Sequence, residues 1–223
     1  FIHEKQFSSD VSHELRTPIT VILAQSDYAL QYSDTFEEAK ESLEVINRHA
    51  KRMTNLINQI MELSKLERQK EIEKEKINLS NIVLQLLEDY KPLLESKNLN
   101  LVYNVEKDLR IQGNKIMLER VFLNILMNAV KFTKTNIEVS LTREDKTAVL
   151  KIRDNGIGIS EENKKFIWER FFQVNDSRNK EENKGSGLGL SMVKKIVDLH
   201  SATIDLESEI EQGTCFTIKF NMQ

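Results

Sequence analysis

The chain has 223 residues, enough for one large domain or two modest ones, and with 39% apolar and 30% charged residues it can form a soluble globular core. Its formal net charge of −3 gives no indication of nucleic-acid binding. No apolar run approaches the roughly 20 residues that cross a bilayer, and the single cysteine, Cys215, excludes an intrachain disulfide and fits a reducing compartment.

The first residue is Phe1 rather than Met, and no signal peptide is present, so we expect a cytoplasmic part of a longer protein. Any membrane anchor or sensor would then lie upstream. We expect neither nucleic acid nor a membrane to contact this part of the protein.

Glycine and proline divide the chain into two parts. Residues 1–67 contain one proline, Pro18, and no glycine, whereas all seven glycines follow residue 110. We therefore predict two domains, 1–67 and 77–223. The charged segment 68–76 between them has two interpretations, a solvated helix end or a hinge, and both can hold.

The first part is predicted to form two long helices. Ser33-Asp34-Thr35 interrupts the helical pattern and precedes Glu37 and Glu38, which suit a helix N-terminus. Apolar residues recur at helical spacing on both sides of this break: Phe7, Val11, Leu15, Ile22, Leu23 and Leu30, then Leu43, Ile46, Ala50, Met53, Ile57 and Ile60. Because a lone hairpin cannot cover its apolar stripe, we predict that two copies pair into a homodimeric four-helix bundle.

The second part alternates between helical and strand-like patterns. The predicted elements, in chain order, are a strand at 76–79, a helix capped by Ser80, a strand at 99–105, a helix capped by Asn114, strands at 137–141 and 148–153, a helix opened by Ser160, a helix at 187–200, and strands at 204–206 and 214–220. Helices and a mixed sheet in this order indicate a two-layer α/β sandwich.

His13 lies on the first predicted helix. An isolated histidine on a helix is usually solvated or a packing residue, but this one has neighbours that suit chemistry. Thr17 shares its face at i+4 and can position a water there, while Pro18 removes a helical hydrogen bond and should bend the helix, which opens this region to another domain. Glu14 can hydrogen-bond one imidazole nitrogen and leave the other as a nucleophile.

A later helix carries Asn124, Asn128 and Lys131 at i, i+4 and i+7, hence on one face. An asparagine oxygen is a suitable ligand for Mg²⁺, and a lysine can offset phosphate charge. Taken alone, this pattern is equally typical of an ordinary polar helix face.

Two glycine-containing loops follow. Asp154-Asn155-Gly156-Ile157-Gly158-Ile159 comes after a predicted strand, where Asp154 can accept a hydrogen bond from the exocyclic amine of adenine, although Asp-Asn-Gly is also a common turn. Lys184-Gly185-Ser186-Gly187-Leu188-Gly189-Leu190 enters a helix and can present free amides to phosphates. It is neither a Rossmann fingerprint nor a P-loop.

Together these segments resemble the bacterial two-component sensor histidine kinases, from Phe7 to about Phe220. Residues 7–18, FSSDVSHELRTP, are similar to the phospho-acceptor box of that family. The N box, the G1 box and the G2 box correspond to the helix around Asn128, the loop after Asp154 and the loop at 185–190. Residues 166–172 resemble the intervening F box, and residues 213–216 a final glycine box. The chain departs from the family pattern at Asn114 and at Ser201-Ala202.

The resemblance implies a fold of a dimeric helical hairpin followed by an ATPase-type sandwich, and a function. ATP with Mg²⁺ would phosphorylate His13, and the phosphoryl group would pass to an aspartate of a response-regulator receiver domain, toward which phosphatase activity is also expected. The implied catalytic residues are His13, Glu14 and Thr17, and Asn128 is the implied Mg²⁺ ligand. The implied nucleotide-binding residues are Asn124, Asn128, Lys131, Phe132, Asp154, Gly156, Gly158, Ile159, Arg170, Gly185, Gly187, Leu188, Gly189, Leu190 and Thr214. Residues 175–184 would be a mobile lid.

Two other functions compete with this one. A related ATPase of the chaperone or mismatch-repair type would use the same nucleotide segments but has no use for His13. A dimeric scaffold with a degenerate nucleotide domain would not need the intact Asn128 and Asp154.

Overall fold

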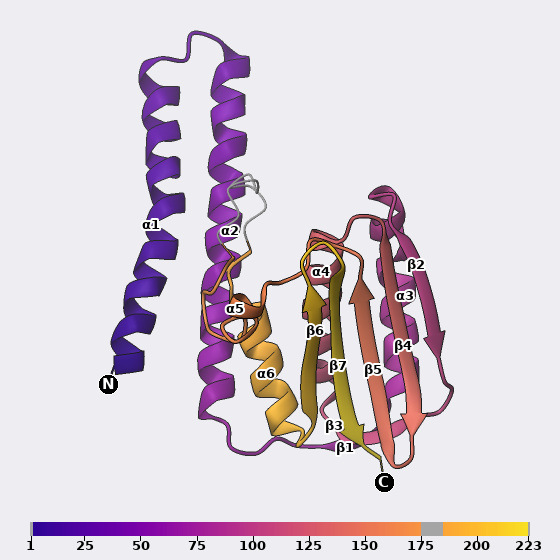
Figure 1. The fold of residues 1–223 in the computed structure, drawn as a ribbon. Helices are drawn as coiled ribbons and strands as arrows, with labels where there is room; N and C mark the ends of the chain where they lie inside the picture. Colours follow the sequence, from indigo (N-terminus) through magenta and orange to yellow (C-terminus); the bar gives the residue numbers. More distant parts are fainter. Residues whose placement is uncertain (1, 175–184, 223) are drawn as a thin grey trace.

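A computed structural model describes residues 2–174 and 185–222, in which a helical hairpin stands beside an α/β sandwich (Figure 1). The hairpin consists of α1 (Ile2–Gln31) and α2 (Phe36–Arg68). Helix α6 of the sandwich lies beside the half of α2 that ends at Arg68 (Figure 1). No helix in the described part of the chain is long and apolar enough to cross a membrane.

The predicted break between the two long helices is confirmed and is stabilised by side-chain capping at Thr35. The Thr35 hydroxyl accepts a hydrogen bond from the Glu38 amide at 3.3 Å, and the Asp34 amide donates to the Glu38 carboxylate at 3.0 Å. Two donors at the start of α2 are therefore satisfied by side chains, which fixes where the second helix begins. Helix α1 continues through Pro18, whose ring is buried.

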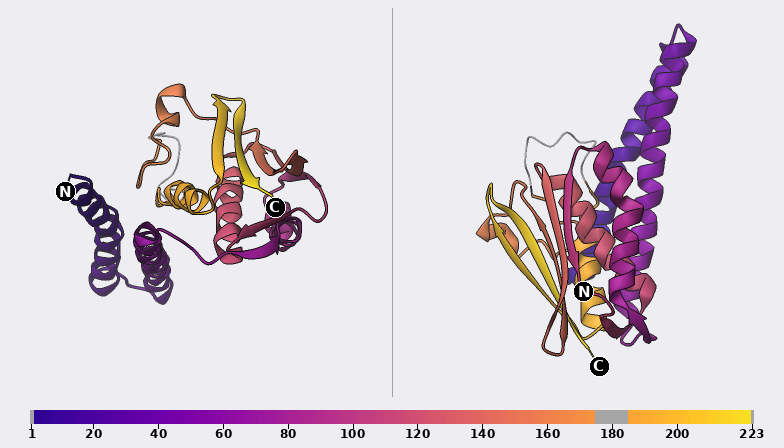
Figure 2. Two further views of the ribbon diagram at one scale, coloured as in Figure 1. Left: turned by 90° about the horizontal axis from the view of Figure 1, so that it is seen from below. Right: turned by 90° about the vertical axis from the view of Figure 1, so that its right-hand side faces the viewer.

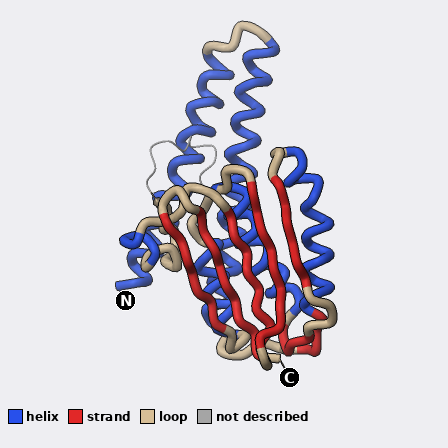
Figure 3. The backbone as a smooth tube through the Cα atoms, turned by 45° about the vertical axis from the view of Figure 1, so that its right-hand side comes forward, coloured by secondary structure: helices blue, strands red, loops and turns tan. Residues whose placement is uncertain are grey.

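The sandwich has two layers, as predicted. Its elements are β1 (Glu75–Asn78), α3 (Leu79–Ser96), β2 (Asn100–Val105), β3 (Arg110–Gly113), α4 (Lys115–Phe132), β4 (Asn136–Glu144), β5 (Thr147–Asp154), α5 (Glu161–Lys164), α6 (Gly189–Leu199), β6 (Thr203–Glu209) and β7 (Gly213–Asn221). The main sheet has the order β2-β4-β5-β7-β6, in which β2 runs parallel to β4 and the other pairs are antiparallel (Figure 3). Helices α3, α4 and α6 cover one face of this sheet (Figure 2).

The core of the sandwich lies between the sheet and these helices. It is built from the apolar positions that alternate along the strands and recur along the helices, among them Leu87, Phe122, Ile125, Leu126, Ile137, Leu141, Ile152, Ile196 and Ile218. Leu56, Leu63 and Leu66 of α2 belong to the same buried cluster. The hairpin and the sandwich thus share one apolar core.

Two predicted helix starts are wrong. Asn78, not Ser80, caps α3, because its side chain accepts from the Asn81 amide at 3.1 Å. The Ser80 hydroxyl instead donates to the Glu106 carbonyl at 2.6 Å and accepts from the Leu109 amide at 3.0 Å, which supports the turn before β3. The last helix begins at Gly189 rather than at Gly187.

Asn114 does cap α4, and a histidine supports it from outside the helix. The Asn114 side chain accepts from the Met117 amide at 3.1 Å, while its own backbone amide donates to Nε2 of His200 at 3.0 Å. Nδ1 of His200 lies 2.7 Å from the Ile196 carbonyl oxygen, so a neutral ring with its proton on Nδ1 satisfies both contacts. Burial lowers the pKa of His200, the contact with Ile196 opposes this change, and Lys74 adds to it.

We expect the stability of the sandwich to depend on pH through His200. Because the folded state favours the neutral ring, this stabilisation is complete above the unfolded-state pKa of about 6.5 and declines as the pH falls toward the lower folded-state pKa. In His200→Gln, a side chain that does not titrate should cost about 1 kcal/mol near neutral pH and flatten the loss of stability on acidification. Urea unfolding followed by circular dichroism across this pH range measures both effects. His13→Gln, which changes an exposed histidine, is the control, and an equal flattening in that variant would contradict the assignment.

Candidate functional site

The glycine-rich loop at 185–190 packs across the polar face of α4. A Cβ atom added at Gly189 would lie 2.6 Å from Oδ1 of Asn124, and one added at Gly185 would lie 3.5 Å from Nζ of Lys131. Asn124 also donates to the Arg120 carbonyl at 2.9 Å, which fixes its amide. The structure therefore brings the predicted N-box and G2-box segments together, and residue 189 needs the close approach that glycine permits.

Lys131 lies at the end of α4, beside this loop. Its Nζ is 4.6 Å from the centroid of the Phe132 ring, a cation–π distance. Burial lowers the pKa of Lys131, and the nearby Arg52 of α2 adds to the effect. A phosphate group bound here would offset the repulsion between these two cations.

Asp154 ends β5 and is buried, with 7% of its surface exposed. One carboxylate oxygen accepts from the Gly156 amide at 2.8 Å. Burial raises the pKa of Asp154, and the backbone amides of Gly156 and Thr214, with Arg153, act in the opposite direction. The role of Asp154 toward the adenine amine stays a prediction.

The loop after Asp154 is packed too closely to hold larger residues. A Cβ at Gly156 would lie 2.1 Å from the Phe132 carbonyl oxygen, and Gly158, with a φ of +70°, would place one 1.9 Å from the Glu209 carbonyl oxygen. The loop therefore touches the end of α4 on one side and the β6–β7 turn on the other. Both glycines are required by close backbone contacts in addition to any ligand.

Asn155 links the site together, although its sequence position indicated only a turn. Its Oδ1 accepts from the amides of Thr135 and Asn136 at 3.0 Å and 2.9 Å, and the Thr133 hydroxyl donates to it at 2.9 Å. Its Nδ2 donates to the Thr135 hydroxyl at 2.8 Å. One amide therefore holds the end of α4 and the start of β4 against the loop that carries Asp154.

Ser208 plays a similar part at the other side of the loop. Its hydroxyl accepts from the Ile159 amide at 2.9 Å, donates to the Gly213 carbonyl at 2.8 Å, and lies 2.9 Å from the Thr214 hydroxyl. This places the predicted Ile159 and Thr214 together. A serine on a strand gives no sequence signal for such a role.

The predicted catalytic residues lie on α1. His13 and Thr17 are exposed, one helical turn apart, and Glu14 is half-buried. Among the residues that the structure describes, no hydrogen bond joins Glu14 to His13. The proposed orienting role of Glu14 stays a prediction.

Arg170 has a partner that the sequence did not predict. It was expected to approach phosphates, and in this structure it forms an ion pair with Glu67 of α2 while its guanidinium lies 4.9 Å from the centre of the Phe7 ring. The next residue, Phe171, has a φ of 60° and donates its amide to the Gly187 carbonyl at 3.0 Å. Residues on both sides of the segment 175–184, which was predicted as a lid and lies outside the described residues, are therefore tied together.

The residues of this site fit a Mg²⁺ ion only if a ligand supplies most of the oxygens. In the residues that the structure describes, no group of three or more His, Cys, Asp or Glu side chains could hold a metal. Asn128 is half-buried on the same helix as Asn124, and its amide oxygen is a hard donor. Magnesium sites of this kind combine one or two protein oxygens with phosphate oxygens and water.

Two family models match the chain. Residues 3–69 match the His Kinase A (phospho-acceptor) domain, and residues 113–223 match the histidine kinase-, DNA gyrase B- and HSP90-like ATPase. The first match separates this chain from the gyrase and chaperone members of the second family, since those would not need a phospho-acceptor hairpin.

Similar proteins are sensor kinases. Histidine kinase P4 of Formosa agariphila is 36% identical over 96% of this chain, and the sensor histidine kinase YkoH of Bacillus subtilis is 30% identical over 99% of it. The chain spans only 16% and 48% of the lengths of these two relatives.

Solved structures share the fold. The histidine kinase ThkA, determined in complex with the response regulator protein TrrA, matches with a TM-score of 0.80 at 22% identity, covering 98% of this chain and 61% of that one. The Acinetobacter baumannii histidine kinase AdeS matches with a TM-score of 0.74 at 22% identity, covering 95% and 98% of the two chains.

We expect Asp154→Asn to weaken binding of an adenine nucleotide about tenfold to a hundredfold, because it replaces a charge-assisted hydrogen bond by a neutral one. Isothermal titration with a non-hydrolysable ATP analogue measures the change. Asp198→Asn is a matched control, since Asp198 is an exposed residue of α6 that pairs with Lys194 at 3.3 Å. Equal losses in the two variants would show that Asp154 does not contact the base.

Proposed function

The chain belongs to the two-component sensor histidine kinases, and on that premise we propose that it transfers the γ-phosphoryl group of ATP to His13 and then to an aspartate of a response-regulator receiver domain. The observation that carries this proposal is that one chain combines an exposed histidine on a helical hairpin with a buried carboxylate and a glycine loop that meet at α4.

The reaction needs an imidazole nitrogen in line with the γ-phosphate. The His13 nitrogen forms a bond to phosphorus while the bond between phosphorus and the bridging oxygen breaks, and ADP leaves with that oxygen. Asp154 holds the adenine, the amides of the glycine loop hold phosphate oxygens, and Lys131 offsets the charge that develops on them. Mg²⁺, held by Asn128 and phosphate oxygens, would supply further charge neutralisation. Arg170 can join the phosphates only after it leaves Glu67.

The active form is proposed to be a homodimer. In a single chain the hairpin leaves a series of large apolar side chains exposed, namely Ile19, Leu23, Leu30, Leu43, Ile57 and Met61. A second hairpin would cover them and complete a four-helix bundle. The matched phospho-acceptor family supports this assembly.

The partner and the setting are proposed from the relatives. ThkA was determined with a response regulator, which supports a receiver domain as the phosphoryl acceptor here. We propose, as the family resemblance implies, that this part is the cytoplasmic region of a membrane-anchored protein. We also propose that Thr17 orients a water that removes the phosphoryl group from the regulator.

His13→Gln should abolish phosphorylation, because it removes the only proposed nucleophile. Incubation of the chain with γ-labelled ATP should give an acid-labile, base-stable label, and this label should fall to background in the variant. His49→Gln, on α2, is the control and should keep the label. Full labelling of His13→Gln would show that His13 is not the phosphoryl acceptor.

Thr17→Ala should reduce dephosphorylation of the regulator about tenfold to a hundredfold while autophosphorylation stays near that of the parent chain. The rates of both reactions, measured on one preparation with a cognate regulator, test the split. Thr20→Ala makes the same change one turn away, where the hydroxyl bonds to the Arg16 carbonyl at 2.9 Å. Equal losses of both activities in Thr17→Ala would indicate damage to α1 instead.

A further inference from the structure

We propose that phosphorylation occurs within one chain: the sandwich delivers the phosphoryl group to His13 of its own hairpin rather than to that of the partner in a dimer. This inference rests on the proposed function and specifies which copy of His13 is the substrate. It follows from where the sandwich lies against the two helices.

The sandwich is fixed on one stripe of α2. The Ser186 hydroxyl donates to Oε1 of Gln59 at 2.6 Å, and Arg120 and Arg170 form ion pairs with Glu62 and Glu67. Between these polar contacts the side chains of Leu63 and Leu66 are buried, with 1% and 4% exposed. Positions 59, 62, 63, 66 and 67 share one face of a helix, so the glycine loop and the F-box segment have a defined orientation on α2.

The sandwich also reaches α1 of the same chain. The ring of Phe171 lies 5.9 Å from the ring of Phe7, and the Arg170 guanidinium lies over the same Phe7 ring. Contact with α2 is imposed by the short connection at 69–74, which extends at most about 20 Å. No short connection forces the sandwich against α1. The contact with Phe7 therefore indicates that the site faces α1 of its own chain rather than α1 of the partner.

His13 lies at the height of the site along the hairpin. Equal counts back from Gln31 and forward from Phe36 place His13 opposite Thr54. Thr54 lies between Arg52 and Gln59 on α2. Arg52 is close enough to Lys131 to lower its pKa, and Gln59 accepts a hydrogen bond from the glycine loop. His13 is also only about 9 Å along the helix axis from Phe7. His13 and the loops that would hold the phosphates therefore lie at the same height of one hairpin.

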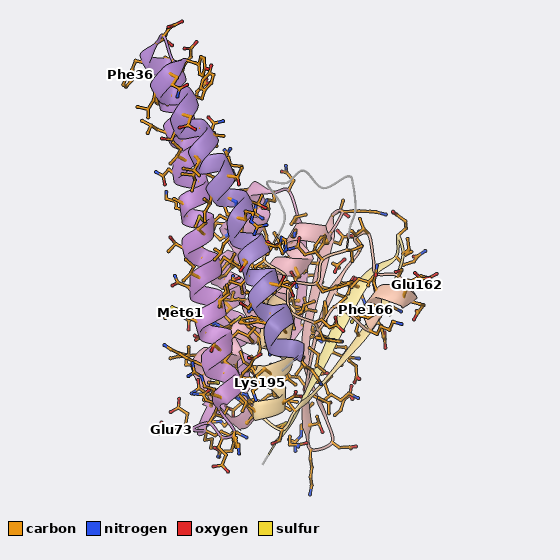
Figure 4. The ribbon with its side chains drawn as sticks, turned by 90° about the vertical axis from the view of Figure 1, so that its left-hand side faces the viewer. Phe36, Met61, Glu73, Glu162, Phe166 and Lys195 are labelled. Carbon is orange, nitrogen blue, oxygen red and sulfur yellow. The ribbon has the colours of Figure 1, made fainter. Side chains whose placement is uncertain are left out.

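The surface left for a second copy is on another side of the hairpin. The side chain of Met61 points away from the sandwich (Figure 4), and Ile19 and Leu23 of α1 are exposed. On a helical wheel His13 lies about 80–120° from these two residues of α1. A partner hairpin that covers the exposed apolar stripe thus leaves His13 accessible to its own sandwich and does not displace that sandwich.

Mixed dimers of the full 223-residue chain test this directly. Two differently tagged forms are coexpressed, and the mixed dimers are isolated by tandem affinity purification and incubated with γ-labelled ATP. In the first pairing one chain carries His13→Gln and the other Asn128→Ala. In the second pairing one chain is unchanged and the other carries both substitutions. A dimer of unchanged chains is the positive control.

The two pairings give opposite results for transfer within and between chains. Transfer within one chain leaves the first pairing unlabelled and gives the second about half of the label of the control dimer, all of it on the unchanged chain. Label on the Asn128→Ala chain of the first pairing, with none in the second, would overturn the inference, and so would equal label in both. An unlabelled control dimer would instead refute the proposed function, which keeps the two failures distinguishable.

A crosslink gives an independent reading that does not depend on catalysis. Gln59→Cys and Ser186→Cys are introduced together with Cys215→Ser, and a short bis-maleimide, which forms a thioether with each of the two thiols, is added to the dimer. The contact within one chain predicts a crosslinked product of monomer size under denaturing conditions. A covalent dimer as the main product would contradict the docking on which the inference rests.

Discussion

The burial of the α2 stripe by the sandwich is the constraint on which the rest of the structure depends. Leu56, Leu63 and Leu66 join the core of the second domain, so the two parts are held by the hydrophobic effect as well as by ion pairs. The ion pairs are partly exposed and contribute little on their own, but they set the orientation that the apolar contact alone would leave open. Where the nucleotide loops point is decided by this one interface.

Inside the sandwich, the site depends on backbone contacts more than on its polar side chains. Gly156, Gly158 and Gly213 each face a carbonyl oxygen closer than a Cβ atom allows, so three segments meet with no room between them. Asn155 and Ser208 then satisfy the polar groups that such close packing would otherwise leave without partners. Asp154 is buried at the centre of this arrangement. A hydrogen bond from an amine to a buried carboxylate is stronger than the same bond in water.

The sequence predicted the parts of the molecule whose signals are local. The hairpin, the cap at Asn114 and the pairing of the central strands follow from periodicity and from residues within one turn of each other. The sequence predicts Ser80 as the cap of α3, whereas in the structure Ser80 bonds to the Leu109 amide and Asn78 caps the helix, and this tertiary contact has no local signal. Strand β3 is four residues long, and within residues 2–174 and 185–222 its pairing partners are β1 and, at one position, Met222, so its formation depends on segments far away in the sequence. The same limit applies to Arg170, whose partner Glu67 is more than a hundred residues away.

The docking of the sandwich on the hairpin keeps the backbone of Phe171 in a strained conformation. A bulky aromatic residue in the left-handed region of backbone space costs about 1–3 kcal/mol, and here it is kept there by the Gly187 carbonyl on one side and the Phe7 ring on the other. Separation of the sandwich from α1 would remove one of these two restraints and let the backbone relax. The strain at Phe171 therefore offsets part of the free energy of docking. The sandwich separates from α1 more easily than the contacts between them alone suggest.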